Sequence, residues 1–160
     1  MTYRVRRVGR EDWERLRELR LAALSDPVAH LAFFEPYEKA VRLGQEDWQR
    51  RASDGERPIF VGETADGKWV GMVGLLTVEA HVEVVGVYIA PEHRGTGLAA
   101  RLMRAAIEGA GGREVRLRVH QNNARAARFY ANLGFQPTGA SAPDPRDPTL
   151  VAYELAYRGD

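Results

Sequence analysis

Residues 91–100 read PEHRGTGLAA, with two glycines among small residues, Arg94 in front and an apolar helical pattern behind. The preceding residues 81–90 have the pattern of a strand, so this stretch joins a strand to a helix. The first N–H groups of a helix have no partner within it, and the helix dipole favours an anion there. Gly95 and Gly97 would let a pyrophosphate approach the backbone without meeting a Cβ atom. The stretch therefore predicts an anion site, although such glycines can also serve only to turn the chain.

Apolar periodicity divides the rest of the chain into strands and helices. Strands are expected at residues 2–8, 59–64, 69–78, 81–90, 114–119, 135–139 and 150–157, and helices at 11–25, 45–52, 97–109 and 124–133. Asp66-Gly67 indicates a hairpin turn, and the three prolines of residues 142–149 predict an irregular loop before the last strand. The order β-α-α-β-β-β-α-β-α-β-β predicts one α/β domain over residues 1–160. Its mixed (α+β), mainly antiparallel sheet would have about seven strands and about four flanking helices.

The composition is that of an ordinary globular chain, with 160 residues, 44% hydrophobic and 28% charged. A net charge of +1 gives no reason to expect nucleic acid or a membrane surface as a partner, and no segment reaches the ~20 apolar residues of a membrane span. The absence of cysteine excludes disulfides and thiolate nucleophiles and fits a reducing cytoplasm, which is the expected location. The four histidines are scattered, so no metal site is expected.

Two common phosphate-binding motifs do not account for the glycine stretch. A Walker A loop is excluded because GxxxxGK[ST] does not occur. The letters GTGLAA satisfy the dinucleotide pattern G-x-G-x-x-A, which also requires an acidic residue about 20 positions on, at the end of the next strand. That strand ends at Val119-His120, and the strands before the glycines are expected to form antiparallel hairpins. A Rossmann-type site is therefore not expected.

A family does match these residues. RGTGLA resembles the Q/R-x-x-G-x-G/A signature of the GNAT superfamily of N-acetyltransferases, with Arg94, Gly97 and Ala99 in the signature positions. The downstream stretch NARAARFYANLGF, residues 123–135, is similar to a second diagnostic segment of the same superfamily. The expected order of strands and helices agrees as well, so the resemblance extends over the whole chain.

The resemblance implies acetyl-CoA as the cosubstrate. Its pyrophosphate would lie on the N–H groups of residues 95–100, and its pantetheine arm would pair with residues 87–89 in a gap before the strand at 114–119. Pantetheine carries amides and can pair with a sheet edge as an added strand does. The cofactor-binding residues implied are Val87, Tyr88, Ile89, Arg94, Gly95, Thr96, Gly97, Leu98, Ala99, Ala100, Asn123 and Tyr130.

Tyr130 is a candidate general acid for the leaving thiolate. Asn123 and Tyr130 lie two helical turns apart and share one helix face, with the small Ala126 and Ala127 between them. A phenol with an ordinary pKa of ~10 is protonated at neutral pH and can donate to a thiolate, whose ordinary pKa is ~8.5. From the sequence alone a packed tyrosine is the simpler interpretation, and the resemblance favours the acid.

Glu83 is the candidate general base that takes a proton from the amine. It stands in a strand that is apolar on both faces, where a carboxylate is costly unless it is used or solvated. The resemblance places a glutamate at this strand in many relatives, whereas Glu83 could also lie at a solvated strand start. Some relatives carry a glutamate on the next strand, where this chain has Arg118. His120 is a second, weaker candidate base, and a surface histidine is the alternative.

The acceptor pocket is expected near the aromatic residues. Phe33, Phe34, Tyr37 and Tyr88, with the loop at residues 142–149, would wall it, although such aromatics often serve core packing. The predicted function is transfer of acetyl to a primary amine of a small molecule or peptide. Direct attack in a ternary complex is expected, since there is no cysteine to carry the acetyl group. The alternative is an acyl-CoA-binding sensor or interaction module without turnover, and a homodimer is left open.

Overall fold

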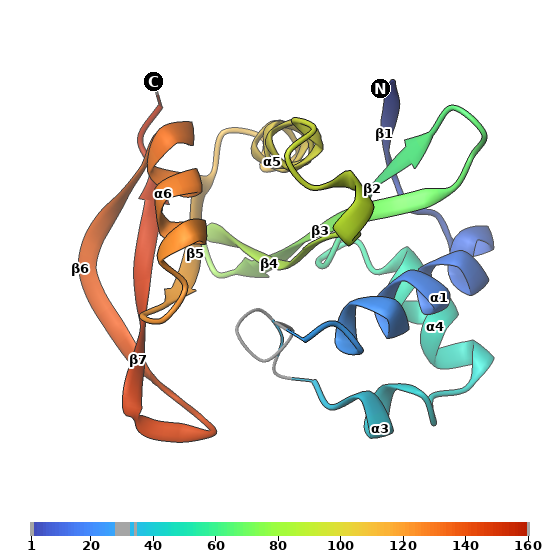
Figure 1. Ribbon diagram of the computed structural model, residues 1–160, viewed down its shortest axis with the longest axis horizontal. Coiled ribbons are helices and arrows are strands. Elements are labelled where there is room, and N and C mark those ends of the chain that lie inside the picture. Colours follow the sequence, from blue (N-terminus) through green and yellow to red (C-terminus); the bar gives the residue numbers. More distant parts are fainter. Residues whose placement is uncertain (1, 28–32, 34, 160) are drawn as a thin grey trace.

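A computed structural model describes residues 2–27, 33 and 35–159 (Figure 1). Seven strands form one sheet in the order β1-β2-β3-β4-β5-β7-β6. The strands are β1 (Tyr3–Arg7), β2 (Ile59–Thr64), β3 (Trp69–Val78), β4 (His81–Ile89), β5 (Glu114–His120), β6 (Phe135–Asp144) and β7 (Asp147–Tyr157). The helices are α1 (Trp13–Leu24), α3 (Tyr37–Ala40), α4 (Gln45–Ser53), α5 (Leu98–Gly109) and α6 (Ala124–Leu133), with 3-10 turns η1 (Arg10–Asp12) and η2 (Pro91–His93).

The predicted fold class is confirmed. Every neighbouring strand pair is antiparallel except β4 and β5, which are parallel. The bounds of β2, β3 and α6 coincide with the predicted ranges. The hairpin turn at Asp66-Gly67 is also present, because Gly67 adopts the left-handed φ of 85° and donates its N–H to the Thr64 carbonyl. The structure adds the short helix α3 to a segment that was expected to be irregular.

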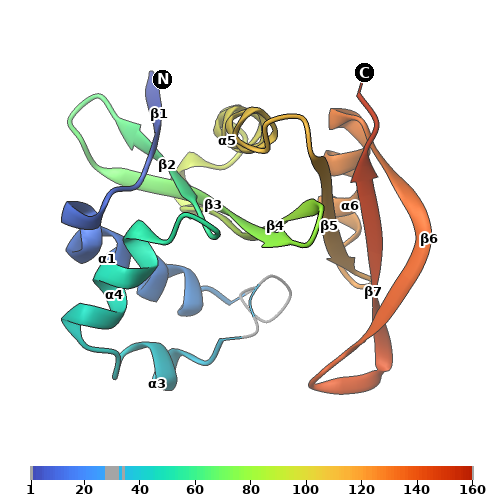
Figure 2. The same cartoon turned by 180° about the vertical axis from the view of Figure 1, so that it is seen from behind.

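Helices cover the two faces of the sheet separately, and each face has its own apolar core. α5 lies on the side opposite α1, α3 and α4, and the view from behind shows the same separation (Figure 2). The stripe Leu98, Leu102, Met103 and Ala106 of α5 is fully buried, and side chains of α6 pack in the same cluster. The second cluster joins α1 and α4 to the other face through Leu16, Leu19, Ala23 and Trp48.

The proline-rich segment is a hairpin, so the predicted irregular loop at residues 142–149 is wrong. β6 runs to Asp144 and β7 begins at Asp147, with Ala142 opposite Ala152 and Pro143 opposite Val151. β6 is the edge strand of the sheet, where the missing N–H of a proline removes no bond from a central ladder. Pro148 precedes the part of β7 that pairs with β5, which begins at Ala152.

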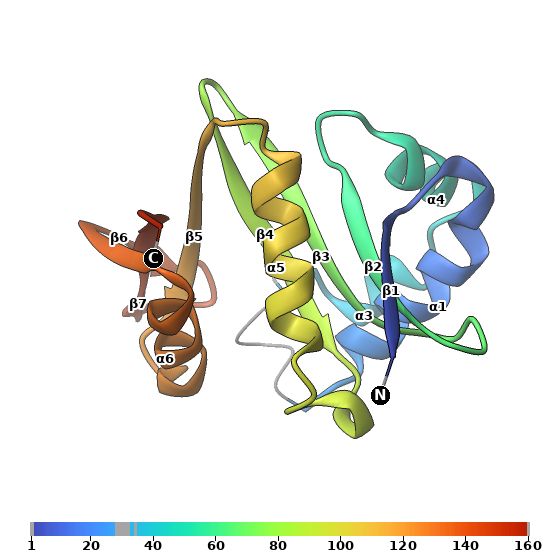
Figure 3. The same ribbon diagram turned by 90° about the horizontal axis from the view of Figure 1, so that it is seen from above.

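β4 and β5 pair over a short distance and then separate. Their register pairs are His81 with Glu114, Val82 with Val115 and Glu83 with Arg116. All later residues of both strands are described, and none of them pairs with the other strand. Figure 3 shows the two strands together at one end and apart at the other, where α5 and α6 begin. None of the helices among the described residues is long and apolar enough to cross a membrane.

Candidate active site

The separation leaves one edge of β4 without a strand partner from Val84 to Ile89 in the described part of the chain. On its other edge β4 pairs with β3, and that ladder contains a bulge between Val85 and Tyr88. Gly86 lies in the bulge with a φ of 61°, a left-handed conformation that glycine adopts without a Cβ penalty. A ligand that carries amides can pair with such an edge. The predicted pantetheine contacts Val87, Tyr88 and Ile89 all lie on this segment.

The glycine loop follows β4 directly and leads into α5. Gly95 and Gly97 have φ values of 76° and 87°, and a Cβ atom at either position would meet nothing within 4 Å. Gly97 is the N-cap of α5 and supplies no side-chain cap, so the N–H groups of Leu98, Ala99 and Ala100 face outward without a capping acceptor. The loop therefore has the open space and the free donors that a pyrophosphate needs, and these residues fit the expected coenzyme.

The side chains of Leu98, Arg94 and Thr96 have structural contacts of their own. The side chain of Leu98 is 1% exposed and packs in the core, which leaves only its backbone for a ligand. The Arg94 guanidinium donates to the Ile89 carbonyl at 3.0 Å and to the carboxylate of Asp26 at 2.8 Å. Thr96 Oγ1 donates to the His93 carbonyl at 2.6 Å. Arg94 and Thr96 thus hold the loop in shape.

Asn123 and Tyr130 lie at the two ends of one face of α6. Asn123 is the N-cap, and its Oδ1 accepts the N–H of Ala126 at 3.2 Å. Tyr130 is 8% exposed, and its ring makes edge contacts with Phe129 and Phe135 at centroid distances of 5.3 and 5.8 Å. Burial raises the pKa of Tyr130 to about 12. Burial is the cause of this shift, and no hydrogen bond from the hydroxyl to another described residue contributes to it, so the phenol is a protonated donor at neutral pH.

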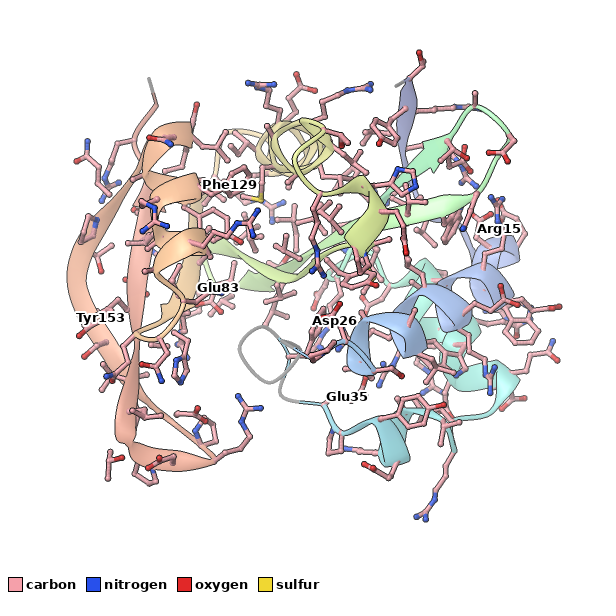
Figure 4. All side chains as sticks on the ribbon, viewed as in Figure 1. Arg15, Asp26, Glu35, Glu83, Phe129 and Tyr153 are labelled. Carbon is pink, nitrogen blue, oxygen red and sulfur yellow. The ribbon has the colours of Figure 1, made fainter. Side chains whose placement is uncertain are left out.

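Glu83 lies at the point where β4 and β5 separate. Val82 and Val84 pack in the cluster of α5, so the alternation of the strand directs Glu83 to the other face, the side of α1 (Figure 4). Its side chain is 16% exposed. Its nearest basic groups are His81 Nε2 at 3.8 Å and Arg118 Nη2 at 3.9 Å, both beyond hydrogen-bond distance. The carboxylate is therefore half-buried, near the Arg118 cation, and without a hydrogen-bond donor among the described residues.

His120 is not the surface histidine that the sequence suggests. It is 6% exposed, its Nε2 lies 3.1 Å from Asp144 Oδ2, and its Nδ1 accepts the N–H of Asn122 at 3.1 Å. This pattern assigns the ring proton to Nε2 and leaves no free nitrogen to act as a base. Hydrogen bonds from the backbone and guanidinium of Arg146 hold the pKa of Asp144 below its ordinary value. The geometry therefore favours Glu83 over His120 as the base.

The predicted acceptor-side aromatics are only partly brought together. Phe33 and Tyr88 are buried in the core cluster that contains α1 and α4, at 5% and 8% exposure. Burial and the nearby Asp26 carboxylate raise the pKa of Tyr88. Tyr37 is 39% exposed on α3 and belongs to neither core cluster. Phe34 lies outside the described residues.

A charged cluster beside Phe33 was not anticipated. Arg20 Nε donates to Glu35 at 3.3 Å, and Arg51 donates to the same carboxylate at 2.5 and 3.0 Å. The two arginines hold the pKa of Glu35 below its ordinary value despite burial. Arg20 follows the buried Leu16 by one helical turn, so a cation on the core-facing stripe of α1 was the signal available in the sequence.

The comparisons with known proteins agree with this geometry. The model of the acetyltransferase (GNAT) family matches residues 12–135. An uncharacterised N-acetyltransferase of Mycobacterium tuberculosis is 41% identical over 91 residues, which cover 54% of this chain and 58% of that protein. The N-alpha-acetyltransferase RimI of the same organism is 30% identical over 105 residues, 61% of this chain and 66% of its own length.

A solved structure shows the same fold. The PaiA N-acetyltransferase of Thermoplasma acidophilum, determined in complex with coenzyme A, superposes with a TM-score of 0.71 at 23% identity. The match covers 96% of this chain and 98% of that one. The chain spans 58% of the length of the uncharacterised mycobacterial relative, so the likeness to that protein is regional.

Proposed function

The chain belongs to the GNAT family of acetyltransferases, and we propose that it transfers the acetyl group of acetyl-CoA to a primary amine of a small molecule or peptide. The observation that carries the proposal is the separation of β4 and β5 after Glu83, directly beside the open glycine loop that begins α5. The free edge of β4 would bind the pantetheine arm and the loop would bind the pyrophosphate. Acetyl-CoA supplies the thioester that the amine attacks.

The proposed proton transfers use two side chains, Glu83 at the point where β4 and β5 separate and Tyr130 on α6, the helix that follows β5. An amine is mostly protonated at neutral pH and must lose a proton before it attacks. Glu83 accepts that proton, since its half-buried carboxylate has no hydrogen-bond donor among the described residues. The new C–N bond forms as the C–S bond breaks, and the Tyr130 hydroxyl donates its proton to the departing thiolate. The raised pKa of Tyr130, about 12, keeps that proton in place until the thiolate forms.

The rest of the site would hold these groups in position. Arg94 connects the glycine loop to Asp26, and Asn123 fixes the start of α6, from which Tyr130 projects. Direct attack on bound acetyl-CoA is proposed because the chain has no cysteine to form an acyl-thioester intermediate.

The experiment that tests the function is CoA-thiol release with acetyl-CoA and a panel of amines: amino acids, polyamines, aminoglycosides and peptides with free N-termini. We expect release with at least one class, and a loss of roughly 10²-fold or more in kcat for Glu83→Gln. Glu79→Gln is the matched control, because Glu79 lies in the turn just before β4. Thermal stabilisation by acetyl-CoA without thiol release from any amine would support the sensor instead.

A further inference from the structure

Arg20 is a cation on the apolar, core-facing side of α1. Its side chain is 22% exposed, and its guanidinium carbon lies 4.6 Å from the centre of the Phe33 ring. Burial lowers the pKa of Arg20, which still remains charged at neutral pH, since the ordinary value of an arginine is ~12.5 or above. A guanidinium in such a place costs free energy unless its donors and its charge are matched.

The guanidinium faces the bulge of β4. A Cβ atom at Gly86 would lie 3.1 Å from Arg20 Nη1 and 3.4 Å from Phe33 Cε1, so Arg20 reaches the strand because position 86 is a glycine. Gly86 follows Glu83 by three residues, roughly 10 Å along a strand. α1 and the Glu83 carboxylate share the same face of the sheet. The distance from Arg20 to the proposed base Glu83 is therefore one that a single small molecule can span.

The donors of Arg20 are mostly unused. Only its Nε makes a hydrogen bond, to Glu35, and neither Nη1 nor Nη2 has an acceptor among the described residues. Glu35 is already bonded twice by Arg51. The cluster thus contains two cations and one carboxylate, and it has an excess of one positive charge. A second anion would complete both the hydrogen bonds and the charge balance.

We propose that this anion is a carboxylate of the acceptor, so that the substrate class is an amino acid or a similar amine that carries a carboxylate. This inference rests on the proposed acetyltransferase function. The planar guanidinium binds a carboxylate through two parallel N–H···O bonds, while the amine of the same molecule is directed to Glu83. The positive excess also disfavours a polyamine, because a second cation would be repelled at this place.

The test uses matched pairs of acceptors that differ only in the carboxylate. The kcat/KM values of amino acids are compared with those of their carboxamides, and with spermidine, at saturating acetyl-CoA. The wild type is expected to prefer the carboxylate by about tenfold or more, mainly through KM. Arg20→Gln should lower kcat/KM for the amino acid by roughly ten- to hundredfold and for the carboxamide far less. Arg20→Lys keeps the charge but loses the planar guanidinium with its two parallel donors. It should therefore restore the preference for the amino acid over its carboxamide only in part.

Arg17→Gln is the control, because it removes one positive charge from the same helix. It should leave the preference unchanged. Equal kcat/KM for acids and amides in the wild type, or a preference for spermidine, overturns the inference and leaves the acetyltransferase function standing. An equal loss on both acceptors in Arg20→Gln also overturns it. If no amine causes release of CoA, both this inference and the proposed acetyltransferase function are contradicted. If Arg20→Gln does not fold, the wild-type comparison of acid with amide decides the matter.

Discussion

Arg94 Nη2 donates a hydrogen bond to Asp26 Oδ2 across 2.8 Å, so the glycine loop ahead of α5 is joined to the residue just past the end of α1. The Asp26 side chain is 6% exposed, whereas that of Arg94 is 37% exposed. The same guanidinium donates through Nε to the carbonyl of Ile89, the last residue of β4. The shape of the proposed pyrophosphate site therefore depends on α1, on the opposite face of the sheet.

Asp26→Asn tests that dependence. The substitution removes the charge that orients Arg94, so the glycine loop should lose its preferred conformation and acetyl-CoA should bind roughly three- to tenfold more weakly. Isothermal titration with acetyl-CoA measures the change. Glu92→Gln, which removes a negative charge from η2 beside the same loop, should leave the affinity within about twofold. Equal affinities of wild type and Asp26→Asn would mean that the ion pair does not shape the site.

Gly97→Ala should weaken both folding and coenzyme binding. A φ of 87° costs an alanine roughly 1–2 kcal/mol, and no neighbour within 4 Å complicates that cost. Gly67→Ala is a matched control, since Gly67 has a φ of 85°, equally open surroundings and a place in the β2–β3 turn. Urea unfolding should show similar losses in both variants. Only Gly97→Ala should weaken acetyl-CoA binding, and an equal effect of Gly67→Ala would argue against the loop as the anion site.

Tyr130→Phe should lower kcat by roughly 10²-fold or more while acetyl-CoA affinity changes little, because the phenol would act on the leaving thiolate and not on the bound thioester. Steady-state rates on an established acceptor, with binding measured separately, check this. Phe129→Leu is a control for packing, since Phe129 contacts the Tyr130 ring without supplying a hydroxyl. A Tyr130→Phe enzyme as fast as the wild type would remove Tyr130 from the mechanism.

The pKa of Tyr130 also predicts a pH dependence of stability. The folded state raises this pKa to about 12, against ~10 in an unfolded chain, so the unfolded state releases the proton first. The resulting stabilisation is fully present below about pH 10 and is lost as the pH rises towards 12, by roughly 2–3 kcal/mol. Free energies of unfolding should therefore fall less between about pH 9 and pH 12 in Tyr130→Phe than in the wild type. Tyr153→Phe, at a side chain 51% exposed, should follow the wild type.

Local patterns predicted the elements well wherever the chain alternates regularly. β2, β3 and α6 coincide with their predicted ranges because turn residues bound each apolar pattern closely. The four-residue helix α3 was missed, since so short a segment shows no full helical period. The hairpin of β6 and β7 was missed because its prolines are compatible with an edge strand only when the sheet order is known.

The site was predictable where sequence neighbours form it. Gly95, Gly97 and the capping Asn123 act through their own turns, and their local conformations follow from residue type. The long-range pairs were not predictable. His120 meets Asp144 across 24 positions and Arg94 meets Asp26 across 68, and no local pattern encodes either contact. Arg20 is the intermediate case. Its position on the apolar stripe of α1 was a signal that the sequence contained, whereas no local pattern pointed to its partner Glu35.

The central claim is direct acetyl transfer from bound acetyl-CoA to an amine, and a single-turnover experiment tests it most directly. The preformed complex with radiolabelled acetyl-CoA is mixed with the best acceptor of the panel, and both the amine and the intact protein are followed over time by mass and by label. The account predicts label on the amine at the rate at which CoA thiol is released, with no acetylated protein at any time. Label that accumulates on the protein, or that remains on CoA while the complex stays intact, would contradict it.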